Sequence, residues 1–69
     1  MFTDIQPGTE WRHHSGRIYV VLFRANDVPE PRPEYPLTIV YQNRVNGTIW
    51  AARADDWHRR MTLTGKSPI

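Results

Sequence analysis

The chain contains no cysteine, a single lysine and only four glycines among its 69 residues. Without cysteine there is neither a disulfide framework nor a thiolate zinc site, so the usual staples of very small folds are excluded. A chain of this length buries only about 60% of the surface that its unfolded form exposes, and we expect it to form one domain. Its stability therefore has to come from packing or from association.

Long apolar segments are missing too. The longest run, Ile18 to Phe23, is far too short to cross a bilayer. Residues 1–4 have neither the basic nor the long apolar region of a signal peptide. We therefore expect a cytoplasmic protein, in the host cytoplasm if a phage encodes it. Hydrophobic residues make up 39% of the chain and charged residues 23%, which is typical of a globular domain and indicates its class better than its activity.

The charge of the chain is only mildly positive, with a formal net charge of +2. A non-specific nucleic-acid binder usually has a stronger excess of positive charge. Eight of the nine cationic residues are arginine, whose planar guanidinium groups form forked hydrogen bonds and stack on aromatic rings. This usage suits a recognition surface, and it also fits a GC-rich genome in which arginine replaces lysine everywhere.

Runs of β-branched and aromatic residues predict four or five short strands. We expect them at residues 10–13, 17–24, 37–42 and 48–53, with a last short strand at 61–63. The strand at 17–24 is apolar on both faces, so we expect each face to be covered. Asn46-Gly47 predicts a hairpin turn within residues 43–47. Acids precede bases in residues 54–61, which favours a short helix or 3₁₀ turn there.

Strands in this order predict an all-β fold, a small SH3-like barrel of four or five antiparallel strands with one helical turn near the C-terminus. We expect a single domain over residues 1–69, with its core at 9–63 and a frayed tail at 64–69. Four prolines within residues 26–36 predict an extended, polyproline-like and exposed loop. This loop is either functional or an ordinary connector.

Several of these residues form a pattern that resembles a known family. The pattern comprises Trp11-Arg12-His13, Gly16, Tyr19, Val21, Val40-Tyr41-Gln42, Gly47-x-x-Trp50-Ala51-x-Arg53 and Trp57. It is similar to a family of short bacterial and bacteriophage proteins classed only as a domain of unknown function, over roughly residues 7 to 60. The resemblance implies a small β-barrel and no particular activity. This chain differs in its longer proline-rich loop, and in Ala52-Arg53 where the family often has Arg-Pro.

The sequence offers little for catalysis. His13 and His14 are adjacent and point to opposite faces of a strand, so His58 would have to join from elsewhere to form a metal site. Asp55 and Asp56 diverge on a helical turn, where they cap it or charge its first turn. None of the motifs for phosphate loops, serine hydrolases or zinc proteases occurs. We therefore expect that the protein is not an enzyme and that it binds neither a metal nor a cofactor.

Two binding hypotheses stay open. In one, rings beside arginines stack bases or a nucleotide while the guanidinium groups hold phosphate. In the other, the protein makes protein–protein contacts, as a homo-oligomer or by binding a host protein, which would cover both faces of Ile18 to Phe23. We expect Tyr19 and Trp50 to belong to the core. The candidate binding residues for either hypothesis are Trp11, Arg12, His13, Tyr41, Gln42, Arg44, Arg53 and Trp57.

Overall fold

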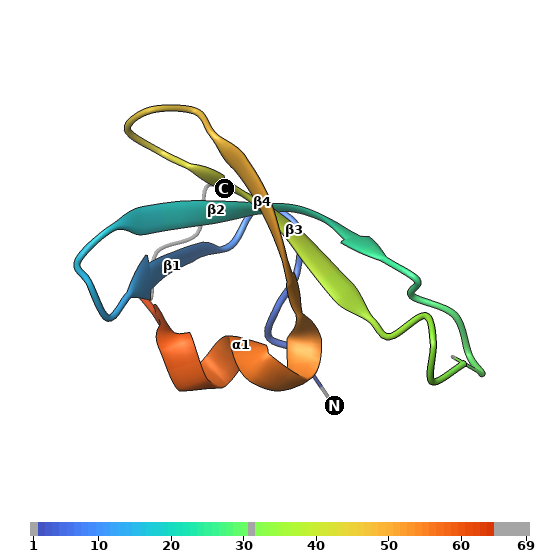
Figure 1. The fold of residues 1–69 in the computed structure, drawn as a ribbon. Helices are drawn as coiled ribbons and strands as arrows, with labels where there is room; N and C mark the ends of the chain where they lie inside the picture. The colour runs from blue at the N-terminus through green and yellow to red at the C-terminus, as the bar shows by residue number, and fades with distance from the viewer. Residues whose placement is uncertain (1, 31, 65–69) are drawn as a thin grey trace.

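The computed structural model, which describes residues 2–30 and 32–64, contains one antiparallel sheet and one short helix (Figure 1). Along the chain the elements are β1 (Glu10–His13), β2 (Ile18–Ala25), β3 (Thr38–Asn43), β4 (Ile49–Arg53), α1 (Ala54–Arg60) and β5 (Met61–Leu63). In space the strands follow the order β4-β3-β2-β1-β5. In the described ranges α1, with seven residues, is the only helix. No helix there is long and apolar enough to cross a membrane.

The five predicted strands and the predicted helical turn are all present, within one or two residues of the expected bounds. The predicted closure into a barrel is not seen, because β4 and β5 lie at opposite ends of the sheet and no pairing between them occurs among the described residues. Gly47 adopts a φ of 75° in the predicted hairpin turn, a conformation that favours glycine. Of the predicted tail 64–69, only Thr64 is described, and its backbone N–H donates to the Glu10 carbonyl.

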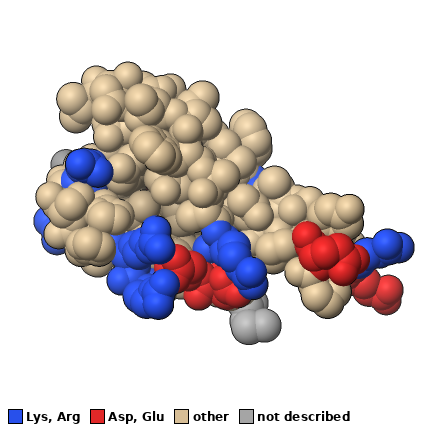
Figure 2. Space-filling view, viewed as in Figure 1, with Lys and Arg blue, Asp and Glu red and all other residues tan. Residues whose placement is uncertain are grey.

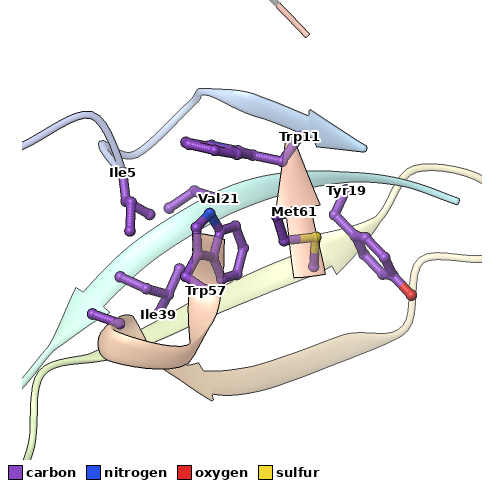
Figure 3. Packing of buried hydrophobic residues seen from close by; sticks show 8 residues of the cluster. Ile5, Trp11, Tyr19, Val21, Ile39, Trp57 and Met61 are labelled. Carbon is purple, nitrogen blue, oxygen red and sulfur yellow. The ribbon is translucent and has the colours of Figure 1, made fainter. Parts of the chain in front are cut away.

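The core lies on one face of the sheet, beneath α1. Its buried members are Ile5, Trp11, Tyr19, Val21, Ile39, Ala54, Trp57 and Met61. Figure 3 shows the Trp57 ring rising from α1 toward the strands, into the middle of this cluster. The ring meets Trp11 and Tyr41 edge to face, at centroid distances of 5.6 Å and 5.0 Å. Such contacts stabilise a core by more than the burial of their apolar area alone provides.

The indole N–H of Trp57 is buried without a hydrogen-bond partner among the described residues. An unpaired buried donor costs roughly 1–3 kcal/mol. The Trp57 ring meets the Trp11 ring edge to face, a favourable arrangement because ring edges carry positive and ring faces negative partial charge. The Trp11 indole N–H, by contrast, donates to Thr9 Oγ1 at 2.9 Å.

The N-terminal segment, residues 2–9, closes one side of the core. Ile5 is fully buried, so the core begins before residue 9, where the sequence predicted its start. Arg24 fixes the segment by donating to the carbonyl oxygens of Phe2 and Ile5, at 2.7 Å and 2.9 Å. Phe2 also stacks on His58 of α1, and Asp4 Oδ2 lies 2.7 Å from His58 Nε2. The segment therefore joins the end of β2 to the helix.

The proline-rich loop connects β2 to β3. Asn26, with a φ of 61°, ends β2, and its side-chain amide donates to the Pro36 carbonyl at 3.0 Å. Described residues from Asn26 to Tyr35 are exposed, as the sequence predicted. A turn closed by the Tyr35 N–H on the Arg32 carbonyl interrupts the predicted extended conformation. We call residues 26–37 the acidic loop, because they include Asp27, Glu30 and Glu34.

Replacing Trp57 with alanine should destabilise the protein by about 3–5 kcal/mol, because the change leaves a cavity in the middle of the core. Trp50, which is 54% exposed, supplies the matched control: Trp50→Ala should cost about 1 kcal/mol or less. Urea unfolding followed by far-ultraviolet circular dichroism measures both variants. Equal losses for the two tryptophans would contradict this account of the core.

The pair between Asp4 and His58 should make stability depend on pH in the acid range. The hydrogen bond from His58 holds the pKa of Asp4 below its ordinary value of 3.8. A lowered pKa in the folded state stabilises the protein above the unfolded-state pKa, and this contribution is lost as the pH falls through the lowered value. Wild type should therefore exceed Asp4→Asn in stability at pH 7, and urea unfolding should show the gap closing toward pH 2. A gap that stays constant would be inconsistent with this role for Asp4.

Candidate interaction surface

The middle of the sheet face that points away from α1 is apolar across β2, β3 and β4, and has no covering element among the described residues. We call it the outer face, and define it by Val20, Phe23, Val40, Ile49 and Ala51. Strand pairing aligns these side chains in two rows across β2, β3 and β4. One row is Val20, Gln42 and Ile49, and the other is Phe23, Val40 and Ala51. Because side chains alternate along a strand, both rows lie opposite the core residues Val21, Ile39 and Tyr41.

A β-bulge in β2 brings Phe23 onto this face. The pairing of β2 with β3 shifts between Val21 and Phe23, so that Leu22 is the extra residue. Without the shift, Phe23 would share the core face with Val21, and Arg24 would point outward. The shift turns Arg24 inward to hold the N-terminal segment, and leaves Phe23 56% exposed.

Exposure and charge set the outer face apart from the rest of the surface. Ile49 is 62% exposed, and Val45, at the tip of the β3–β4 hairpin, is 90% exposed. In Figure 2 the charged side chains gather on the side of the molecule where α1 lies and around the acidic loop, whereas the upper part of the view, over β2, β3 and β4, is nearly free of charge. A contiguous apolar patch on a small protein marks an interaction site.

Two of the predicted binding residues, Trp11 and Trp57, are 1% exposed and serve the core. Tyr41 also points to the core, half-buried between Tyr19 and Trp57, and burial raises the pKa of its hydroxyl. Trp50, which we expected in the core, instead lies half-exposed at the sheet edge and donates its indole N–H to Thr48 Oγ1. The sequence prediction therefore exchanged the roles of buried and exposed tryptophans.

The polar candidates lie in four different settings. Arg12 and Arg44 come together in one groove with Ile18, Val45 and Leu63, at the end of the outer face, and Gln42 lies within the face. His13 accepts a hydrogen bond at Nδ1 from the Ser15 N–H, and desolvation together with the nearby positive charges of His14, Arg17 and Arg60 lowers its pKa. Arg53 pairs with Asp55 at 2.9 Å beside α1, and this hydrogen bond raises the arginine pKa.

The acids of α1 are engaged with arginines. Asp56 pairs with both Arg59 and Arg60, and no side-chain cap hydrogen bond is made at the helix start. Of the two roles expected for Asp55 and Asp56, the structure therefore supports charging of the first turn. Within residues 2–30 and 32–64, no cluster of three or more His, Asp or Glu is arranged to hold a metal ion.

Sequence reasoning missed the outer face as a set. It noted that Ile18 to Phe23 is apolar on both sides, which is the signal that points to Val20 and Phe23. It missed Val40, Ile49 and Ala51, because each lies in a strand whose own pattern does not show which face the core takes.

Comparison with family models, with curated proteins and with solved structures finds no match for this chain. The resemblance to a domain of unknown function stays a prediction.

Proposed function

We propose that this protein is a non-catalytic interaction module that self-associates through its outer face. The observation that supports this most directly is the apolar character of both rows across β2, β3 and β4, with only Gln42 as a polar member. Covering such a face removes apolar area from water, which stabilises an assembly by roughly 25 cal/mol for each Å². A chain without disulfides gains from this in particular.

A second copy of the chain is the occupant that we propose. Across β2, β3 and β4 the two rows contain no charged residue, so this part of the face would meet itself without repulsion between like charges. The row of Val20 continues onto β1 as Glu10, which is paired with Arg44. A two-fold contact uses the same patch on both partners, and this patch satisfies that requirement. The pair of sheets would then pack face to face, about 10 Å apart, as in a β-sandwich.

We also propose that the fold is an SH3-like barrel that remains open between β4 and β5. Its support is the connectivity: β1 to β4 follow one another as a meander, β5 returns to the free edge of β1, and α1 lies between the last two strands. In this view α1 occupies the gap through which a closed barrel would pair β4 with β5.

The alternative hypothesis, binding of nucleic acid or a nucleotide, has weaker support. Its strongest feature is the groove that holds Arg12 and Arg44, yet Arg44 is paired with Glu10 at 3.0 Å. The aromatic rings that would stack bases are largely in the core, since Trp11 and Trp57 are buried. Addition of a mixed single-stranded oligonucleotide to the experiment below tests this alternative directly.

Sedimentation of the purified protein over a range of concentrations tests the proposal. We expect a dimer whose apolar contact persists in 1 M salt, because salt screens exposed charges and not apolar burial. Phe23→Ala should weaken this dimer by at least tenfold in Kd. Trp50→Ala removes an equally exposed ring from the opposite face and should leave the Kd unchanged.

A protein that stays monomeric to millimolar concentration would overturn the proposal. Equal weakening by Phe23→Ala and Trp50→Ala would place the contact elsewhere. A monomer that gains mass only with the oligonucleotide, and only at low salt, would favour the nucleic-acid hypothesis instead.

A further inference from the structure

Among the described residues, the unpaired acids lie at one end of the sheet and two of the three unpaired arginines lie at the other. Five acids form ion pairs, namely Asp4, Glu10, Asp27, Asp55 and Asp56. Among residues 2–30 and 32–64, the acids without an ion pair are Glu30 and Glu34, and both lie in the acidic loop. The arginines without an ion pair are Arg32, in the same loop, and Arg12 and Arg17, at the other end.

The two ends are well separated. Arg12 of β1 lies opposite Ile18, the first residue of β2, and Arg17 directly precedes Ile18 in the chain. The acidic loop follows Ala25, the last residue of β2. Eight residues of strand span roughly 26 Å. Figure 1 shows the turn before β2 and the loop after it at opposite ends of the molecule. We call the end with Arg12 and Arg17 the basic end; all four of these unpaired residues, Arg12, Arg17, Glu30 and Glu34, are exposed.

The size of the outer face is a reason to consider a dimer contact that extends onto the ends of the sheet. Three strands about 4.8 Å apart and six residues long cover roughly 290 Å² in projection. A standard interface buries about 800 Å² on each partner, roughly a sixth of the 4997 Å² surface of this chain. The apolar rows are smaller than such an interface, and a contact that continued onto the charged ends would come closer to the standard size.

Charge then selects the orientation. If the two sheets packed with their strands parallel, each acidic loop would lie over the partner's acidic loop, and each basic end over the partner's basic end. With the strands antiparallel, each basic end lies over the partner's acidic loop. Electrostatic complementarity of this kind fixes the register of an interface and disfavours the wrong one.

We infer that two copies of the chain pack outer face to outer face with antiparallel strands, and that the basic end of each copy binds Glu30 and Glu34 of the other. This inference rests on the proposed self-association and assigns its geometry. The groove beside Arg12 offers the site, because Ile18 and Leu63 give it an apolar floor and Arg12 leaves a guanidinium free for a carboxylate.

Charge reversal tests the geometry. The first variant combines Arg12→Glu with Arg17→Glu, and the second combines Glu30→Arg with Glu34→Arg; all four positions are exposed, and circular dichroism checks that the fold is kept. Alone at low salt, each variant should dimerise at least tenfold more weakly than wild type. Mixed in equal amounts, they should form a heterodimer with a Kd near that of wild type, because both contacts are complementary again.

Sedimentation with one variant fluorescently labelled distinguishes heterodimer from homodimer. In 1 M salt the differences between the variants should largely disappear. If wild type dimerises and the mixture does not recover, or if the variants dimerise as wild type does, the antiparallel geometry is wrong while the proposed self-association stands. If wild type is monomeric throughout, the proposed function itself fails.

Discussion

The packing of Trp57 against the sheet is the contact on which the rest of the structure depends. A seven-residue helix without a side-chain cap is not stable alone, so its position has to come from tertiary contacts. Trp57 provides them by meeting Trp11 of β1 and Tyr41 of β3. The same contact fixes α1, which follows β4 and precedes β5 in the chain, against one face of the sheet. One helix and the N-terminal segment thus complete a core on one face only.

Because α1 and the N-terminal segment both cover the core face, the outer face stays uncovered. In the described part of the chain, no further element is left to cover Phe23 and Val40, although β2 is apolar on both sides. Among residues 2–30 and 32–64, the charges near α1 are paired with one another, whereas the unpaired acids and arginines lie toward the two ends of β2. Two apolar rows that lie between ends with different unpaired charges suit a symmetric partner better than a polyanion. Under the function that we propose, self-association would contribute both to the stability of the protein and to its function.

Much of the fold could be predicted from the sequence, because strand patterns and Asn46-Gly47 are local signals. The candidate site was harder to predict, since it depends on register. The bulge at Leu22 places Phe23 on the outer face, and no local sequence pattern predicts this bulge. The tryptophans show the same limit. The residues around Trp50 and Trp57 do not indicate which ring is buried, and the position of α1 makes Trp57 buried while Trp50 stays exposed. Barrel closure failed as a prediction because it is a property of two strands that have to meet across the whole sheet.

The reactivity of a single thiol on the outer face tests the central claim most directly, because the protein has no cysteine of its own. Val40→Cys places a thiol in the middle of the face, and Arg59→Cys places one on exposed α1. If the outer face is covered by a second copy, the rate of thiol labelling at position 40 should fall as protein concentration rises through the dimer Kd, while the rate at position 59 stays constant. Equal, concentration-independent rates in a protein that is dimeric would show that the dimer forms through another surface.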